Sequence, residues 1–160
     1  MKLAALIFLV LMVLPLAAHG ADGSENSLPV VQASEILAKI QKGEPVEYDH
    51  VKVKGDLDLS KSSLQTNITS PIRINDSAFD GVVSFNYTNL DESIDLSGSN
   101  FTKKASFRGA TFSGNADFSY VTFSGDASFR GATFSGDASF RGATFGGNAY
   151  FRDSSFNFIP

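Results

Sequence analysis

Large apolar residues recur along the last two-thirds of the chain in steps that alternate between six and five residues. From residue 101 onward each such position is phenylalanine: Phe101, Phe107, Phe112, Phe118, Phe123, Phe129, Phe134, Phe140, Phe145, Phe151 and Phe156. A small or aliphatic residue, most often alanine, stands two positions before each large one. Because side chains two apart on an extended segment point to the same face, each pair predicts a very short strand with one small and one large inward side chain. Steps of five and six match no helical face, so the pattern excludes a helix here.

The same rhythm appears as a repeat of eleven residues. Residues 124–134 and 135–145 both read SGDASFRGATF, and close variants fill 102–123 and 146–156. Weaker copies run back to residue 54, with QTNI at 65–68 as the break in the register. One strand of five or six residues cannot bury its own apolar face, but stacked copies can. Two repeats make a four-sided coil of 22 residues, so residues 22 apart should stack at about 4.8 Å, the usual separation of neighbouring strands.

This stacking predicts four columns of inward side chains. They are Phe85/Phe107/Phe129/Phe151, Leu90/Phe112/Phe134/Phe156, Leu96/Phe118/Phe140 and Phe79/Phe101/Phe123/Phe145. Aromatic rings can stack with an offset at this spacing. Each six-residue step contains one extra residue, which we expect at alternate corners of the coil: Lys104, Asn115, Asp126, Asp137 and Asn148. Glycine after the large residue permits a tight turn with positive φ.

The repeat resembles that of the pentapeptide-repeat family, whose five-residue unit has Leu or Phe at its centre, a small residue two before it and often Gly two after. Here the unit reads ASFRG at 105–109, 127–131 and 138–142, and ATFSG at 110–114 and 132–136. The resemblance covers about residues 54–156 and implies an all-β fold, a right-handed quadrilateral β-helix with its Phe-centred columns inside. The family's usual coil has four units of five, so the inserted residues here predict bulged corners. Residues 33–60 also resemble the leader of exported, archaeal-type members.

Residues 1–20 read as a secretory signal peptide. Lys2 gives a positive start, residues 3–18 form an apolar run, and Ala18-His19-Gly20 offers small residues at the cleavage site. The run is short for a membrane span and contains Pro15. We therefore expect an exported protein, at the cell surface or extracellular, with an uncleaved membrane anchor as the alternative. The chain has no cysteine, which excludes disulfides and a thiol-linked lipid anchor.

Between the signal peptide and the repeats we expect a polar linker at 21–31 and an N-terminal cap at 32–53. The segment 34–42 (SEILAKIQK) predicts a short amphipathic helix with Ser34 as N-cap and Gly43 at its C-terminal cap. The alternation in VEYDHVKVKG (46–55) predicts a strand. Helix and strand together can cover the first coil, whose backbone is otherwise unpaired. The tail at 157–160 either folds over the last coil, leaves it to meet a second copy, or marks a truncation.

Candidate chemistry is sparse. The chain has two histidines, His19 in the signal peptide and His50 beside Asp49, where we expect a solvated or capping role. No Ser–His–Asp, metal-ligand or phosphate-loop arrangement can be assembled, so we expect no enzymatic activity, metal or cofactor. With 13 basic and 17 acidic residues the formal net charge is −4, which argues against nucleic acid as a partner. Some family members resemble duplex DNA and bind type II topoisomerases, but this chain lacks the dense acidic surface for such mimicry, and its export separates it from that target.

Two sets of surface residues are candidate sites. Arg108, Arg130 and Arg152 are 22 apart and predict a column of positive charge, which is either screened by solvent or forms a groove for anions or polysaccharide. Four N-x-S/T sequons are candidate glycosylation sites in an exported chain: Asn67, Asn75, Asn86 and Asn100. The predicted function is a non-catalytic structural or protein-interaction module, with a homodimer formed through the C-terminal end. The alternative is a carbohydrate- or anion-binding surface protein whose partner is a surface glycan.

Overall fold

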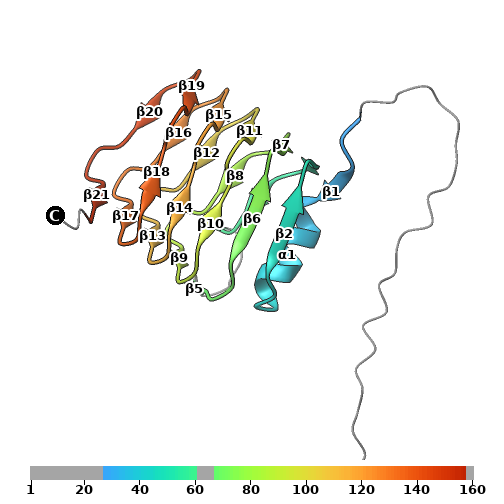
Figure 1. Cartoon of the computed structure of the whole chain (residues 1–160), viewed down its shortest axis with the longest axis horizontal. Coiled ribbons are helices and arrows are strands. Elements are labelled where there is room, and N and C mark those ends of the chain that lie inside the picture. The colour runs from blue at the N-terminus through green and yellow to red at the C-terminus, as the bar shows by residue number, and fades with distance from the viewer. Residues whose placement is uncertain (1–26, 61–66, 158–160) are drawn as a thin grey trace, which may run out of the picture.

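The computed structural model describes residues 27–60 and 67–157. The predicted signal peptide and residues 158–160 lie outside these ranges. The described chain forms one short helix followed by coils of a parallel β-helix, with the helix at one end of the stack and the last strand at the other (Figure 1). Over the same residues, no helix has the length and apolar character needed to span a bilayer.

Four parallel sheets form the four faces of the β-helix. The first face contains β1 (Val30–Gln32), β3 (Lys52–Lys54), β7 (Ala78–Phe79), β11 (Asn100–Phe101), β15 (Thr122–Phe123) and β19 (Thr144–Phe145). The second contains β4 (Leu57–Asp58), β8 (Val83–Ser84), β12 (Ala105–Ser106), β16 (Ala127–Ser128) and β20 (Ala149–Tyr150). The third contains β5 (Asn67–Ile68), β9 (Asn89–Leu90), β13 (Thr111–Phe112), β17 (Thr133–Phe134) and β21 (Ser155–Phe156). The fourth contains β2 (Val46–Asp49), β6 (Ile72–Asn75), β10 (Ile94–Asp95), β14 (Ala116–Asp117) and β18 (Ala138–Ser139).

The strand register gives the length of each coil. Thr111 pairs with Thr133, and the other pairs among the later coils are likewise 22 residues apart. Across the QTNI segment the separation grows to 26 residues, as in the pair of Leu57 and Val83. The four extra residues therefore lengthen one coil without shifting the inward phase of the next. The register confirms the quadrilateral β-helix predicted from the sequence.

Stacked phenylalanine rings fill the interior. Nine ring pairs 22 residues apart lie parallel or nearly so, with centroids 4.5–5.6 Å apart. Rings from neighbouring faces meet edge to face, as Phe118 meets Phe129 at 5.3 Å and 80°. Both arrangements are favourable for aromatic quadrupoles, and close packing adds dispersion attraction. Among the described residues, all the large inward side chains from Leu57 to Phe134 are buried.

The corners of the coil are of two alternating kinds. One kind is a four-residue turn, in which the carbonyl of Phe107 accepts a hydrogen bond from the N–H of Ala110 at 3.2 Å. Its third residue, Gly109, has φ of 63°, the positive value that such a turn requires. The other kind has three residues between the large and the small inward side chains, as the inserted residues predicted. There the Asn115 side-chain oxygen accepts the backbone N–H of Asp137 in the next coil at 3.1 Å, which bonds successive bulged corners to each other.

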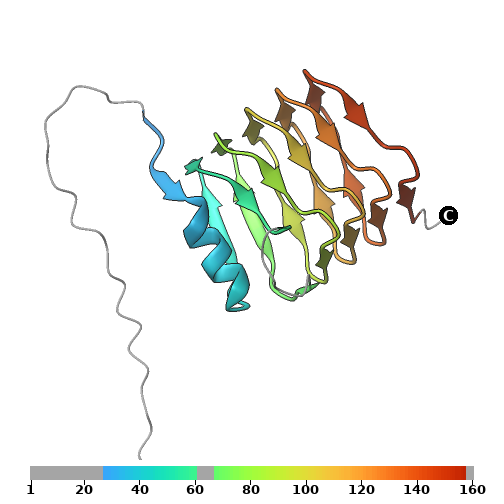
Figure 2. The same cartoon turned by 180° about the vertical axis from the view of Figure 1, so that it is seen from behind.

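The N-terminal cap differs in detail from the prediction. Helix α1 (Ala33–Gln41) contacts β1, β2 and β4 and buries Ala33 and Ile36 against the first coil (Figure 2). It begins one residue before Ser34, and its N-cap is Gln32, which makes no side-chain capping bond. Ser34 is therefore not the N-cap. The predicted polar linker also ends earlier than expected, because Val30 and Val31 pair with β3.

Candidate functional site

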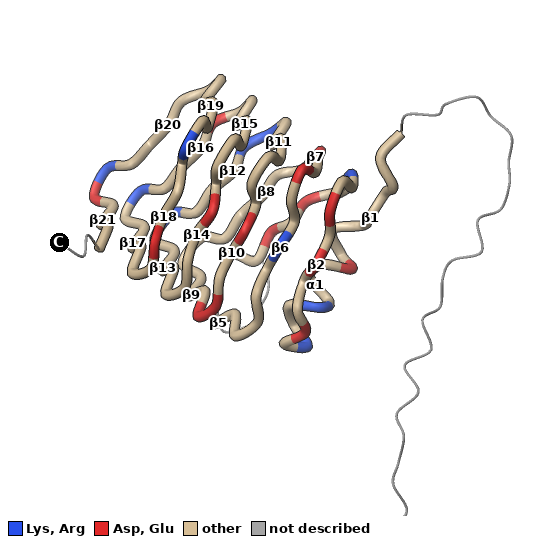
Figure 3. The backbone as a smooth tube through the Cα atoms, in the orientation of Figure 1, with Lys and Arg blue, Asp and Glu red and all other residues tan. Residues whose placement is uncertain are grey.

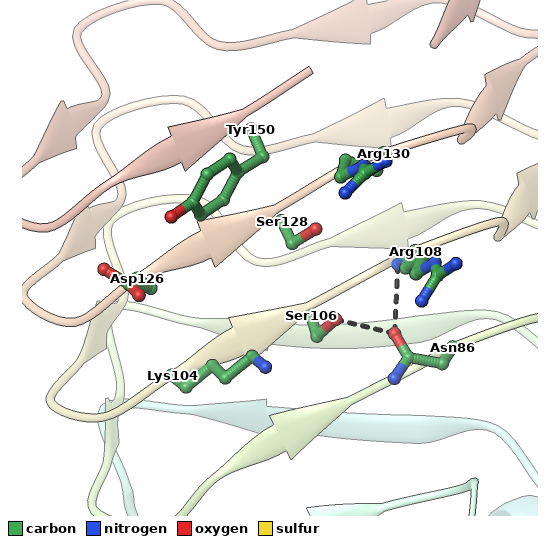
Figure 4. Close-up of a pocket in the computed structure, with 8 residues that line it drawn as sticks. All are labelled: Asn86, Lys104, Ser106, Arg108, Asp126, Ser128, Arg130 and Tyr150. Atoms are coloured by element: carbon green, nitrogen blue, oxygen red, sulfur yellow. Dashed lines mark hydrogen bonds between the residues drawn. The ribbon is translucent and has the colours of Figure 1, made fainter. Parts of the chain in front are cut away.

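A basic hollow lies on the second face of the β-helix. It measures about 310 Å³, and Figure 4 shows the eight residues that line it: Asn86, Lys104, Ser106, Arg108, Asp126, Ser128, Arg130 and Tyr150. The strand register explains its shape. Ser106, Ser128 and Tyr150 occupy the same outward position in β12, β16 and β20, so two short side chains form a low floor and the tyrosine ring forms a wall.

The corners on either side of these strands supply the charged rims. Arg108 and Arg130 follow β12 and β16, while Lys104 and Asp126 precede the same two strands. The two floor serines are largely shielded from solvent by the longer side chains around them, with Ser106 only 5% and Ser128 9% exposed. A side chain longer than serine on this floor would fill the hollow.

Hydrogen bonds fix two members of the hollow. The Asn86 side-chain oxygen accepts from Ser106 Oγ at 2.6 Å and from the backbone N–H of Arg108 at 3.0 Å (Figure 4). This leaves the Asn86 amide N–H₂ as a donor. Asp126 Oδ1 accepts the backbone N–H of Asn148 at 2.9 Å, so this carboxylate is tied to the next corner. The extra residue of the repeat thus has a structural role here.

The predicted arginine column is divided in the structure. Arg108 and Arg130 both line the hollow, and neither forms an ion pair with a carboxylate of the described chain. The guanidinium of Arg108 lies over the ring of Tyr87, 5.7 Å from its centroid. Arg152 does not line the hollow, and its Nε lies 3.4 Å from Asp153 Oδ2. The sequence analysis identified the arginines as a candidate site but not the other residues that line the hollow with them, such as Lys104 at a corner and Ser128 and Tyr150 on the strands.

The four sequons differ in exposure. Asn67 and Asn100 are exposed, and Asn86 is half-buried in the hollow. Asn75 is only 8% exposed, and its amide nitrogen donates to Asp95 Oδ2 at 3.0 Å. A glycan on Asn75 would compete with this hydrogen bond, whereas Asn67 and Asn100 present their side chains to solvent.

His50 belongs to an exposed cluster at the corner after β2 and β6. Its Nδ1 lies 3.0 Å from Asp49 Oδ2, and Asp76 of the following coil is close enough that one ligand atom from each residue lies within 4.8 Å of the others. The hydrogen bond and negative charge of Asp49 raise the pKa of His50. Asp49 is next to His50 in the sequence. The proximity of Asp76 could not be predicted from the sequence, because it depends on the 26-residue coil that brings the two corners together. All three side chains are exposed, as in a solvated ion pair.

The last described coil is exposed at the end of the stack. Each of β18, β19, β20 and β21 pairs with one strand of the described chain and stands at the edge of its sheet. Ala149 is exposed, Phe145 and Phe151 are half-buried, and Phe156 is 38% exposed, although the same positions one coil earlier are buried. At the other end of the stack α1 covers the core (Figures 1 and 2).

Acidic and basic residues are interspersed along the solenoid (Figure 3). This distribution differs from the dense acidic surface that mimicry of duplex DNA requires.

Comparison with known families agrees with the architecture. Residues 107–155 match the family model described as pentapeptide repeats (9 copies), which confirms the resemblance over the most regular coils. No curated protein and no solved structure matches the chain.

Proposed function

We propose that this protein is a structural or protein-interaction module outside the cell, which associates with a second copy of itself through its last coil. The observation that carries the proposal is the sheet edge formed by β18, β19 and β20, each of which pairs with one strand of the described chain. Unpaired edges of this kind are templates for pairing with another chain, and natural proteins usually cover them. Here the edge adjoins half-buried rings of the core, so that pairing would also bury apolar surface.

A second copy is the partner whose surface matches this end. Two identical ends related by a two-fold axis place the same strand edges and the same rings against each other, which makes a self-complementary interface. Strand pairing across the interface would use main-chain hydrogen bonds, and the aromatic columns would continue from one copy into the other. The coil repeat that stacks within one chain would thus be extended between chains.

The predicted signal peptide at residues 1–20 supports the location outside the cell. A module that acts by association needs no catalytic residues, in agreement with the expectation from the sequence that the protein is not an enzyme. Its stack of parallel coils is a rigid scaffold on which outward residues are held at regular positions.

Sedimentation velocity tests the proposal on the chain from Ala21 onward. The expected result is a dimer that increases with protein concentration. Ala149→Asp, which places a charge at the exposed end, should abolish it. Removal of residues 158–160 shows whether the tail contributes to the contact. Val30→Asp is the matched control, because Val30 is 55% exposed in the edge strand β1 at the opposite end. A monomer at all concentrations, or a dimer equally sensitive to Val30→Asp, would overturn the proposal.

A further inference from the structure

We propose that the basic hollow of the second face binds an acidic polysaccharide, whose sulfate or carboxylate groups lie between Arg108 and Arg130. The inference does not require the association proposed above, because the lining of the hollow is supplied by a single chain; the two share only β20, which carries Tyr150. It rests on four observations: an excess of unpaired cations, a regular repeat along the stack, an aromatic wall and open space on the far side of the arginines.

The first observation is the charge. Lys104, Arg108 and Arg130 line the hollow with a single carboxylate, that of Asp126. No ion pair of the described chain neutralises the three cations. Guanidinium groups present planar forks of N–H donors that match carboxylate and sulfate oxygens, and such charge-assisted hydrogen bonds are about twice as strong as neutral ones. The Asn86 amide adds a further donor on the same wall (Figure 4).

The second observation is repetition. Arg108 and Arg130 hold the same position in successive coils, because β12 and β16 pair in register with Ser106 opposite Ser128. The two guanidinium groups are therefore one strand separation apart at their backbones, about 4.8 Å. A polymer with an anionic group on successive sugars can meet both. A single small anion does not require two arginines at a regular spacing.

The third observation is the wall and floor. Tyr150 is 43% exposed, stands in register with Ser128, and presents its ring at one end of the hollow (Figure 4). An exposed aromatic ring offers an apolar face together with a polar hydroxyl group, a combination that suits the alternating apolar and hydroxylated surfaces of a sugar.

The fourth observation is a second hollow of about 270 Å³ on the other side of the two arginines, lined also by Tyr87, Gly131 and Asp153. An added Cβ at Gly109 would lie 2.7 Å from the ring of Tyr87, so that ring fills the space above Gly109. At Gly131, one coil further, an added Cβ would meet nothing within 4 Å. The position next to Arg130 is thus open where the chain's own ring fills its counterpart next to Arg108, and a sugar ring can occupy it.

The net charge of −4 does not oppose such a site. Charges further away than about 8 Å are largely screened at physiological ionic strength, so the three cations at the hollow dominate the local potential. The same screening predicts that binding weakens as salt is added.

The test uses dextran sulfate and neutral dextran, which share a backbone and differ in charge, with affinity measured by titration calorimetry on the chain from Ala21. We expect binding to dextran sulfate only. The double variant Arg108→Gln/Arg130→Gln should weaken it roughly tenfold or more, the loss that follows removal of charge-assisted hydrogen bonds. Tyr150→Ser should also weaken the binding of dextran sulfate. Thermal unfolding of each variant verifies that it remains folded.

Arg141→Gln is the matched control. Arg130 and Arg141 occupy the same position of two identical repeats, SGDASFRGATF, but Arg141 lies at a corner of the fourth face, over the ring of Tyr120 at 5.8 Å. If the hollow is the site, Arg141→Gln leaves the affinity unchanged while Arg130→Gln lowers it. Equal losses for these two single variants would mean diffuse attraction and would overturn the proposal. The proposal would also be overturned if inorganic sulfate bound as tightly per anionic group as dextran sulfate and Tyr150→Ser had no effect. The site would then recognise the anion and not a sugar chain. Dimerisation is read separately by sedimentation, so the two proposals fail independently.

Discussion

The rings of Phe112 and Phe134 lie parallel within 1°, with their centroids 4.7 Å apart. The two residues are one coil apart, and their strands pair in register. Phe134 is therefore bounded by a ring on either side along its column, Phe112 and Phe156, and by Phe140 of a neighbouring face, which it meets edge to face. A gap in such a column cannot be filled by rotation of a neighbour, because the neighbours are themselves held by the coils on either side.

Phe129→Ala should destabilise the protein by about 3–5 kcal/mol, the usual cost of removing a buried aromatic ring and leaving a cavity. Phe129 is fully buried and stacks at 5.0 Å on Phe107 below and on Phe151 above. Equilibrium unfolding in urea measures the change.

Ser128→Ala is the control for this prediction. Ser128 precedes Phe129 and points outward into the hollow, so its removal should change the free energy of unfolding by no more than about 0.5 kcal/mol. Equal effects of the two substitutions would show that the inward phase of the strand is wrong.

Two glycines of one coil should differ in how strongly their replacement by asparagine destabilises the protein. Gly131 has φ of 64° with open space around it, and asparagine tolerates this backbone conformation, so Gly131→Asn should cost about 1 kcal/mol or less. An added Cβ at Gly125 would lie 2.7 Å from the backbone carbonyl carbon of Lys103 in the coil before. Because backbone cannot move aside as a side chain can, Gly125→Asn should cost on the order of 3 kcal/mol. Urea unfolding of both variants checks the order, and a larger loss at Gly131 would contradict the stacking of these corners.

The pKa of His50 should lie above its ordinary value of 6.5, because Asp49 accepts a hydrogen bond from the imidazolium and adds a favourable charge. With a raised folded-state pKa, the pair stabilises the protein fully below pH 6.5, and this contribution is lost as the pH rises through the folded-state pKa. Titration of the imidazole resonances by NMR measures the value. In Asp49→Asn the pKa should fall back towards 6.5, and an unchanged pKa in that variant would exclude the proposed cause.

Much of the fold follows from the sequence because each coil repeats the same short strands, with one small and one large inward residue. The alternation of six and five residues was enough to predict four faces and a 22-residue coil, and the insertion at 65–68 changes one coil only. The start of α1 was not predictable in the same way. A local signal favoured Ser34, but β1 pairs with β3 immediately before the helix and sets its first residue. The pairing of these two strands is a long-range contact, so the start of the helix could not be predicted from local N-cap preferences.

The candidate site was less predictable than the fold. A period of 22 places Arg108 and Arg130 in one column, yet it also adds Arg152, which forms an ion pair with Asp153 in the structure. Tyr150 lies at the hollow because it stands in register with Ser128, and Lys104 lies at the corner before the strand of Ser106. The second hollow beside the arginines depends on which glycine a neighbouring ring covers: the ring of Tyr87 covers Gly109, and no ring covers Gly131.

The most direct test of association through the last coil is the midpoint of thermal unfolding, measured over a roughly hundredfold range of protein concentration. A partner that binds only the folded chain stabilises it by mass action, so the midpoint should rise with concentration in the chain from Ala21 onward. In Ala149→Asp it should stay constant at the value that the parent chain shows at its lowest concentration. A midpoint that does not depend on concentration in the parent chain, or one that rises equally in both proteins, would contradict the account.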